Sequence, residues 1–293
     1  MATIPKDLAI AATERKLLLF IGAGFTRNID KSLPTWSNII DEMANILGYD
    51  PDILKLQGDY LQLAEYLNLC GLKDKLIVQL AKSVDDETKY SISKSQPHLL
   101  LPHLDVRSIY TTNWDNWIER GFDHEKVPYQ KIAMPRDFSE VKLTSKTSFP
   151  IVLQTSIQSC NTSPRHYAVP YIVKFHGDFN HPDSIVINET GYYKRLDFNH
   201  PLDLRFRSDI IGCSVLFIGY SFSDPNVRYI WYKLGQSMKD SGVIVKSYFV
   251  THQNNPVQEK IFLNANIEQV LLDPIDIKKS LVDVLKSLIQ CQQ

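Results

Sequence analysis

Cysteine is scarce in this chain, and the few cysteines lie far apart. The 293 residues include four of them, and no two form a Cys-x-x-Cys pair: Cys70, Cys160, Cys213 and Cys291. Structural zinc sites use ligand pairs at short spacing, so this distribution argues against a zinc ribbon. His98 and His103 are five residues apart on an expected helix and do not share a face, which makes them a poor metal pair. We expect reduced thiols and no metal site.

Long apolar runs and an excess of charge of one sign are also missing. The chain has 32 Lys and Arg against 33 Asp and Glu, and no basic run dense enough to mark a nucleic-acid surface. The N-terminus lacks a basic segment leading into an apolar one, and the apolar run 17–21 is far too short to span a bilayer. We therefore expect a cytoplasmic protein that neither enters a membrane nor binds nucleic acid directly.

Short apolar segments alternate with segments of helical periodicity. The apolar segments predict strands at 16–21, 106–110, 171–175, 184–187, 214–218, 245–251 and 267–272. The periodic segments predict helices at 36–47, 60–80, 114–120, 225–238 and 275–289. This alternation is typical of an α/β fold, a Rossmann-like doubly wound parallel sheet with helical insertions. We expect one domain over residues 1–293, with a less regular insertion at about 135–170.

Four of the predicted strands end in a glycine or polar motif, and ligands of open parallel sheets bind at the carboxyl ends of the strands. The first motif is Gly22-Ala23-Gly24, followed by Thr26. Glycines at such a turn let the backbone approach a phosphate, but a tight structural turn accounts for them as well. Arg27 occupies the place of the third glycine in a Gly-x-Gly-x-x-Gly pattern, and it fits a pyrophosphate contact and a solvated surface residue equally.

The second and third motifs carry the side chains suited to chemistry. Asn113 follows the strand at 106–110, where it either contacts a ligand or, like Thr112, caps the next helix. His176 stands between a buried strand and Gly177. A histidine in a cleft suits proton transfer, although a lone histidine is more often structural.

The fourth motif, Gly219-Tyr220-Ser221, follows the strand at 214–218. Gly219 and Ser221 are placed to line a ribose or a phosphate. Asp224, directly before Pro225, fits a helix N-cap better than a ligand contact.

These four motifs, in this order, resemble the sirtuin family, whose pattern is Gly-Ala-Gly, Thr-Gln-Asn-Ile-Asp, His-Gly and Gly-Thr-Ser. The matching stretches extend over roughly residues 15 to 250, and the second reads Thr111-Thr112-Asn113-Trp114-Asp115. Protein-deacylating sirtuins also carry a zinc lobe held by four cysteines, and this chain has no zinc lobe. The stretch Tyr-Ser-Phe-Ser-Asp-Pro at 220–225 is instead similar to divergent bacterial sirtuin-like proteins, many of them NAD-consuming effectors of anti-phage defence.

The resemblance implies an NAD⁺ hydrolase that cleaves the bond between nicotinamide and ribose. It implies Asn113 and His176 as the catalytic pair, the first motif and Thr26 at the pyrophosphate, and Asp115 at the nicotinamide or behind Asn113. Gly219 and Ser221 would border the adenosine half of NAD, and no metal is needed. It also implies control of the activity by homo-oligomerisation or by a partner such as a HerA-type ATPase.

Two other functions stay open from the sequence. A protein deacylase uses the same NAD chemistry with an acyl-lysine as the nucleophile, and the missing zinc lobe argues against it. A non-catalytic module that senses NAD or ADP-ribose would use Asn113 and His176 as structural caps, would bind NAD and would never release nicotinamide.

Overall fold

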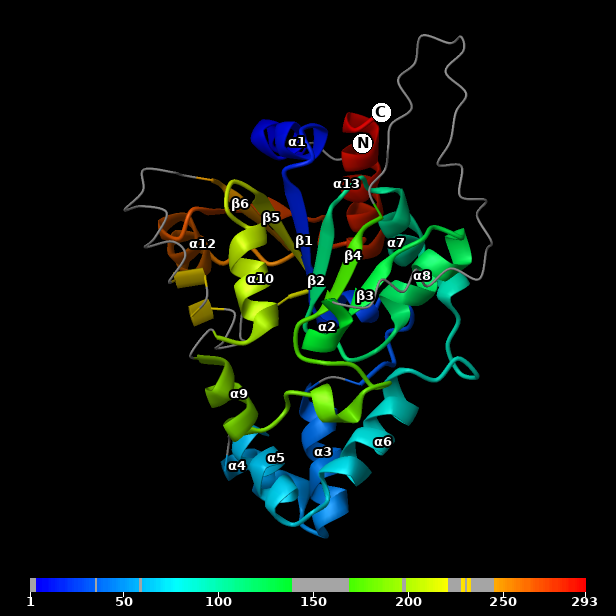
Figure 1. The fold of residues 1–293 in the computed structure, drawn as a ribbon, viewed down its shortest axis with the longest axis vertical. Coiled ribbons are helices and arrows are strands. Elements are labelled where there is room, and N and C mark those ends of the chain that lie inside the picture. The colour runs from blue at the N-terminus through cyan, green and yellow to red at the C-terminus, as the bar shows by residue number, and fades with distance from the viewer. Residues whose placement is uncertain are drawn as a thin grey trace.

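Seven parallel strands form one sheet at the centre of the protein (Figure 1). The computed structural model describes residues 4–34, 36–57, 60–138, 169–196, 199–220, 228–229, 231–232 and 245–293. The strands are β1 Leu17–Ile21, β2 Ser108–Thr111, β3 Gln130–Ile132, β4 Tyr171–Lys174, β5 Ser214–Ile218, β6 Ser247–Thr251 and β7 Ile267–Leu271.

The strand order is β3-β4-β2-β1-β5-β6-β7, and every pairing between neighbours is parallel. The chain extends the sheet from β1 to one side through β2 and β4, and then to the other side from β5 onward. The order therefore reverses between β1 and β5, which is where doubly wound sheets bind their ligands. The predicted Rossmann-like α/β fold is confirmed. The four strands that carry the motifs, β4, β2, β1 and β5, lie side by side.

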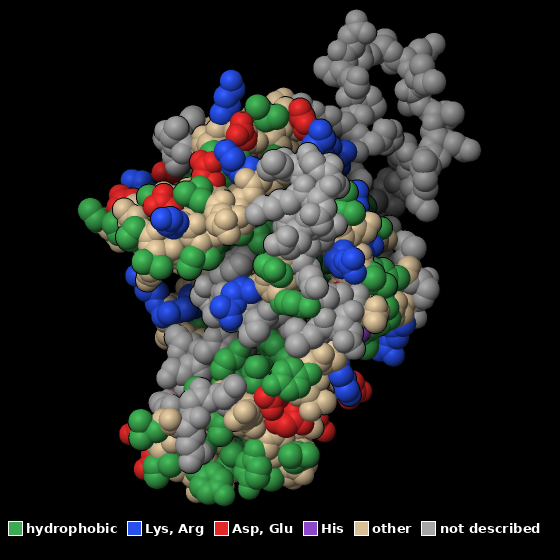
Figure 2. All heavy atoms as spheres, turned by 90° about the vertical axis from the view of Figure 1, so that its left-hand side faces the viewer, with side chains coloured by type: hydrophobic (Ala, Val, Ile, Leu, Met, Phe, Trp, Pro, Cys, Tyr) green, Lys and Arg blue, Asp and Glu red, His purple; other side chains and the backbone are tan. Residues whose placement is uncertain are grey.

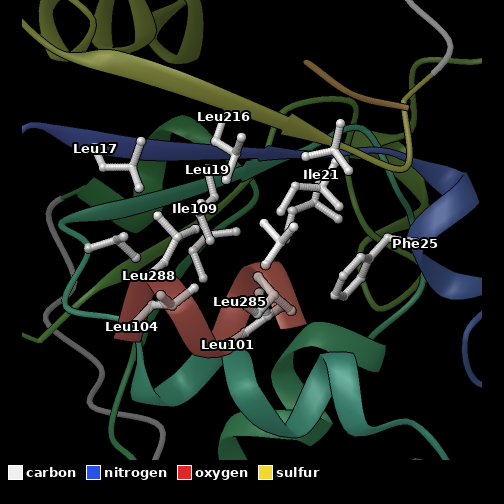
Figure 3. Close-up of a cluster of buried hydrophobic side chains, with 14 of the residues drawn as sticks. Leu17, Leu19, Ile21, Phe25, Leu101, Leu104, Ile109, Leu216, Leu285 and Leu288 are labelled. Carbon is white, nitrogen blue, oxygen red and sulfur yellow. The ribbon is translucent and has the colours of Figure 1, made fainter. Parts of the chain in front are cut away.

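Burial of both sheet faces explains the continuous apolar character of β1. Successive side chains of a strand point to opposite faces, and all five residues of β1 are buried. Leu17, Leu19 and Ile21 contact one apolar cluster (Figure 3), whereas Leu18 and Phe20 contact another.

Helices cover both faces of the sheet. The first cluster packs against α1 Lys6–Thr13, α7 Gln96–Leu100, α8 Trp117–Glu125 and α13 Ile277–Cys291. The second packs against α10 Pro201–Asp209 and α12 Pro256–Asn264. None of the helices within the described ranges is long and apolar enough to cross a membrane.

A separate group of helices, which we call the helical lobe, lies beyond the carboxyl ends of the strands (Figure 1). It consists of α3 Trp36–Leu47, α4 Pro51–Gln57, α5 Tyr60–Leu69 and α6 Lys73–Val84. Its own apolar core includes Trp114, Ile185 and Ile187 from the loops that follow β2 and β4. Figure 2 shows apolar side chains gathered on this lobe. The exposed apolar residues of the lobe are Tyr49, Ile53, Leu56, Tyr66 and Leu69, among others.

The structure corrects two predictions about local structure. The expected strand at 184–187 is wrong, because Pro182–Ser184 forms a 3-10 turn and Ile185 and Ile187 pack into the helical lobe instead of the sheet. The expected helix 60–80 is two helices, which Gly71 separates by adopting a φ of +70°. Most of the predicted helix 225–238 and most of the predicted insertion at 135–170 fall outside the described residues, and the described residues 228–229 and 231–232 of that helix are helical.

Candidate active site

The carboxyl ends of β1 and β5 pack closely against each other, and the residues in contact are glycines. Gly22 precedes α2 Ala23–Thr26, and a Cβ atom on Gly22 would lie 2.6 Å from the carbonyl oxygen of Gly219. A Cβ atom on Gly24 would lie 2.9 Å from that same oxygen, to which the Gly24 N–H donates a 2.8 Å hydrogen bond. Close packing of two strand ends therefore accounts for these glycines by itself. Contact of this turn with a pyrophosphate stays a prediction.

Asn113 is held by the first motif. Its Nδ2 donates hydrogen bonds to Thr26 Oγ1, 2.9 Å away, and to the carbonyl oxygen of Gly22, 3.2 Å away. Thr111 Oγ1 accepts a 3.0 Å hydrogen bond from the Asn113 N–H. Asn113 is only 6% exposed, and its Oδ1 has no hydrogen-bond donor among the described residues. The amide is thus fixed with a buried acceptor oxygen that has no donor in the described part of the chain, an arrangement suited to orienting a hydroxyl group or a water molecule.

Asp115 supports Asn113 indirectly. Thr26 Oγ1 donates a 3.0 Å hydrogen bond to Asp115 Oδ2, so the hydroxyl of Thr26 connects the carboxylate to the amide of Asn113. The other oxygen, Oδ1, accepts from the N–H of Trp117 at the start of α8. Burial raises the pKa of Asp115 to about 6, although the nearby Lys174 ammonium opposes this rise. Of the two predicted roles, this geometry favours support of Asn113.

The pKa of Asp115 leads to a prediction about stability. An acid with a higher pKa in the folded state binds more protons when folded, so raising the pH from about 4 to about 6 removes stability. The rise from 3.8 to about 6 corresponds to about 3 kcal/mol at pH 7. We expect the free energy of unfolding of the wild type to fall over this range relative to Asp115→Asn. Urea unfolding of both proteins at several pH values measures this, and a difference that is independent of pH would contradict it.

His176 follows β4 and packs against the aromatic ring of Tyr192. It is 2% exposed, and its ring centroid lies 5.2 Å from that of Tyr192 in α9 Glu189–Leu196. Its carbonyl oxygen accepts a 2.9 Å hydrogen bond from the N–H of Val186. Gly177 follows with a φ of +91°, and a Cβ atom there would lie 2.3 Å from the carbonyl oxygen of Ser184. Glycine is therefore required for the chain to turn directly after the histidine.

Arg195 supports the strand end that carries His176. Its Nη1 donates a 2.7 Å hydrogen bond to the carbonyl oxygen of Phe175, and its guanidinium lies 4.5 Å from the centroid of the Phe175 ring. Asp203 of α10 pairs with it, with 2.8 Å between Arg195 Nε and Asp203 Oδ2. Because both charges are buried and paired, the backbone before His176 is firmly held.

Sheet register places Asn113 and His176 at matching positions. Thr111 of β2 pairs with Lys174 of β4, and Ile21 of β1 pairs with both Thr111 and Ile218 of β5. Asn113 and His176 therefore each lie two residues beyond paired positions of adjacent parallel strands. They share the carboxyl edge of the sheet with the first and fourth motifs.

The structure thus brings most of the predicted site residues to one edge. Gly22, Ala23, Gly24, Thr26, Asn113, Asp115, His176 and Gly219 all follow or end these four strands, whereas Ser221 lies outside the described residues. Within the described ranges, no group of three or more His, Cys, Asp and Glu side chains is placed to hold a metal ion. His98 is fully buried, and burial lowers its pKa to about 3, so it is unsuited to proton transfer at neutral pH.

Two buried cations, Lys174 and Arg195, were not predicted from the sequence. They contact the segments that carry Asn113 and His176. A lysine that ends an apolar strand directly before Phe175 and His176 is a detectable signal, since burial of an ammonium is costly. Arg195 gives no such signal, because its partner in α10 and its contact with Phe175 both depend on the tertiary fold.

Comparison with known proteins gives consistent results. A sequence profile described as the SIR2-like domain matches residues 107–274, more than half of the chain. The chain is 27% identical over 225 residues to the NAD(+) hydrolase ThsA of Bacillus cereus (strain MSX-D12), covering 77% of this chain and 41% of that protein. It is 26% identical over 239 residues to the NAD(+) hydrolase ThsA of Cytobacillus dafuensis, covering 81% and 42%. The chain therefore spans about two fifths of the length of these relatives.

Proposed function

The chain belongs to the SIR2-like domain family, and from that premise we propose that it hydrolyses NAD⁺ to nicotinamide and ADP-ribose. The observation that carries the proposal is the amide of Asn113, which is fixed through Nδ2 against the loop that follows β1 and whose acceptor oxygen has no hydrogen-bond donor among the described residues. The relatives that bear the name NAD(+) hydrolase support the same reaction. NAD is the substrate in this proposal, and no metal takes part.

Each side chain takes a role that its geometry allows. The loop of Gly22, Ala23 and Gly24 borders the pyrophosphate together with Thr26, and Gly219 and Ser221 border the adenosine half. Asn113 Oδ1 accepts a hydrogen bond from the attacking water or from a hydroxyl group of the nicotinamide ribose.

The reaction consists of one bond exchange at the ribose C1′ atom. The bond from C1′ to the nicotinamide nitrogen breaks, its electron pair leaves with nicotinamide, and positive charge develops on the ribose. A water oxygen bonds to C1′, and a ring nitrogen of His176 accepts the proton that the water loses. Such a general base typically contributes about 10²–10⁴-fold to the rate.

We further propose that the chain acts as a single domain and depletes NAD during anti-phage defence, under control of homo-oligomerisation or of a partner such as a HerA-type ATPase. Two features support control through the helical lobe. Glu65 of α5 accepts 2.8 Å hydrogen bonds from the Thr190 N–H and from Asn188 Nδ2 at the start of α9, which carries Tyr192 against His176. The exposed apolar side chains of the lobe offer a surface for such contacts (Figure 2).

Nicotinamide release from NAD by the purified chain tests the reaction. We expect release without any peptide, and a loss of about 10²–10⁴-fold in His176→Ala, as for removal of a general base. Assays of each oligomeric fraction from size-exclusion chromatography test the control, and full activity in a monomer without a partner would contradict it.

Addition of an acyl-lysine peptide separates the competing functions. Release that depends on the peptide would identify a deacylase instead of a hydrolase. NAD binding by titration without release under either condition, in the wild type and in every oligomeric fraction, would indicate a binding module.

A further inference from the structure

A buried lysine at the end of β4 contacts both loops of the proposed active site. Lys174 is fully buried and precedes His176 by two residues. Its Nζ donates a hydrogen bond to the main-chain carbonyl oxygen of Asp115, two residues after Asn113. The same Nζ lies 3.5 Å from the Oδ2 of Asp178, two residues after His176. One ammonium group therefore joins the two loops at equivalent positions.

The charges around this lysine are balanced. Lys174 Nζ also lies 3.3 Å from Glu119 Oε1 of α8, and Lys131 Nζ of β3 lies 2.6 Å from Asp178 Oδ2 and 3.5 Å from Glu119 Oε1. Burial alone would lower the pKa of Lys174, but Glu119, Asp178 and Asp115 together raise it, so the group stays charged. Two cations thus face the carboxylates of Glu119 and Asp178.

Stability alone does not account for this arrangement. Each buried ion costs several kcal/mol in lost hydration, and apolar replacements of similar volume are often neutral or stabilising. The two residues before Lys174 in β4, Ile172 and Val173, are apolar and fully buried. The contacts of the ammonium group explain why position 174 is charged. They are directional and fix the two loops relative to each other, whereas an apolar side chain would leave the loops independent.

We propose that Lys174 is a positioning residue that holds the Asn113 loop and the His176 loop in the one arrangement needed for cleavage of NAD. This inference rests on the proposed function, because the two loops carry its reacting groups. Lys174 does not contact the substrate and acts only through the main chain of Asp115 and the carboxylate of Asp178.

A charge-balanced double variant, compared with a single variant as its control, tests the proposal. Glu119→Gln keeps the contacts of Lys174 with Asp115 and Asp178, whereas Lys174→Met combined with Glu119→Gln removes the ammonium without leaving an extra buried carboxylate. Lys174→Met alone is a poor test, because an unpaired buried charge costs about 3–5 kcal/mol. Thermal unfolding of both proteins verifies that they fold.

We expect kcat of the double variant to fall about 10- to 100-fold below that of Glu119→Gln, as for a small displacement of reacting groups. The KM for NAD should change less than about threefold, because the binding surface is intact. A merely structural role would lower the melting temperature and leave kcat of the folded fraction unchanged. A kcat within about twofold of the control would overturn the proposal.

Hydrogen exchange separates failure of this inference from failure of the proposed function. If the wild type releases no nicotinamide, amide exchange at residues 112–116 and 176–180 decides instead. Faster exchange in both loops of the double variant, but not in Glu119→Gln, would support coupling through Lys174. Unchanged exchange, or a change in one loop only, would overturn it.

Discussion

Replacement of Asn113 by Ala is expected to reduce kcat for nicotinamide release by about 10²–10³-fold, the usual effect of removing one preorganised polar group. The structure fixes this side chain through Nδ2, which donates to Gly22 and Thr26, and leaves Oδ1 to act on the substrate or on water. Steady-state kinetics of both proteins measure the change. NAD titration should show retained binding, because the pyrophosphate and adenosine contacts are assigned to other residues, which the alanine substitution leaves in the chain.

Asn113→Asp is the sharper test of the same arrangement. Aspartate has nearly the same shape, but it cannot donate from the Nδ2 position, so an oxygen would face the Gly22 carbonyl oxygen about 3.2 Å away. We expect a loss similar to that of Asn113→Ala. Thr26→Ser is the matched control, since it keeps the hydroxyl that Asn113 and Asp115 contact. Activity of Asn113→Asp within tenfold of the wild type would show that the anchoring of Nδ2 is not required.

The sheet was the easiest part of the fold to predict from the sequence. Strands such as β1 and β5 are buried on both faces, so their sequences are apolar apart from Ser214, and both strands are followed directly by glycine. The three-residue strand β3 is only partly buried, and nothing in its sequence distinguishes it from a loop. Residues 184–187 have strand-like composition, but they pack on the helical lobe because Gly177 turns the chain away from the sheet.

The candidate site also has a part that could be predicted from the sequence and a part that could not. Asn113, His176 and the glycines were predictable because each follows a recognisable strand, and parallel strands bring their carboxyl ends to one edge. The contacts that support these residues were not predictable, because the contacts join separate segments of the chain, such as Thr26 with Asp115 and Arg195 with Phe175. No local pattern encodes such pairs. The sequence left open whether the glycines of the first motif have a structural role, and the structure shows that they allow the ends of β1 and β5 to pack closely.

That structural role predicts a large loss of stability in Gly219→Ala. Gly219 has a φ of +65°, and a Cβ atom there would lie 2.2 Å from the backbone nitrogen of Phe25. The left-handed backbone costs alanine about 1–2 kcal/mol, and relief of the overlap requires the backbone after β1 to move away from β5. Displacements of this kind cost about 1–3 kcal/mol more, and the lower entropy of alanine in the unfolded chain offsets part of the sum, so we expect the free energy of unfolding to fall by about 2–4 kcal/mol.

Gly212→Ala is the matched control for this prediction. Gly212 also has a positive φ, +75°, but no atom lies within 4 Å of the position of its Cβ atom. Alanine there meets only the backbone strain, which its lower entropy in the unfolded chain partly offsets, so the expected loss is about 1 kcal/mol or less. Urea unfolding of the two variants measures the difference, which isolates the contact between the first and fourth motifs. Equal losses would show that β1 and β5 tolerate separation at their carboxyl ends, and that the glycines serve the ligand instead of the packing.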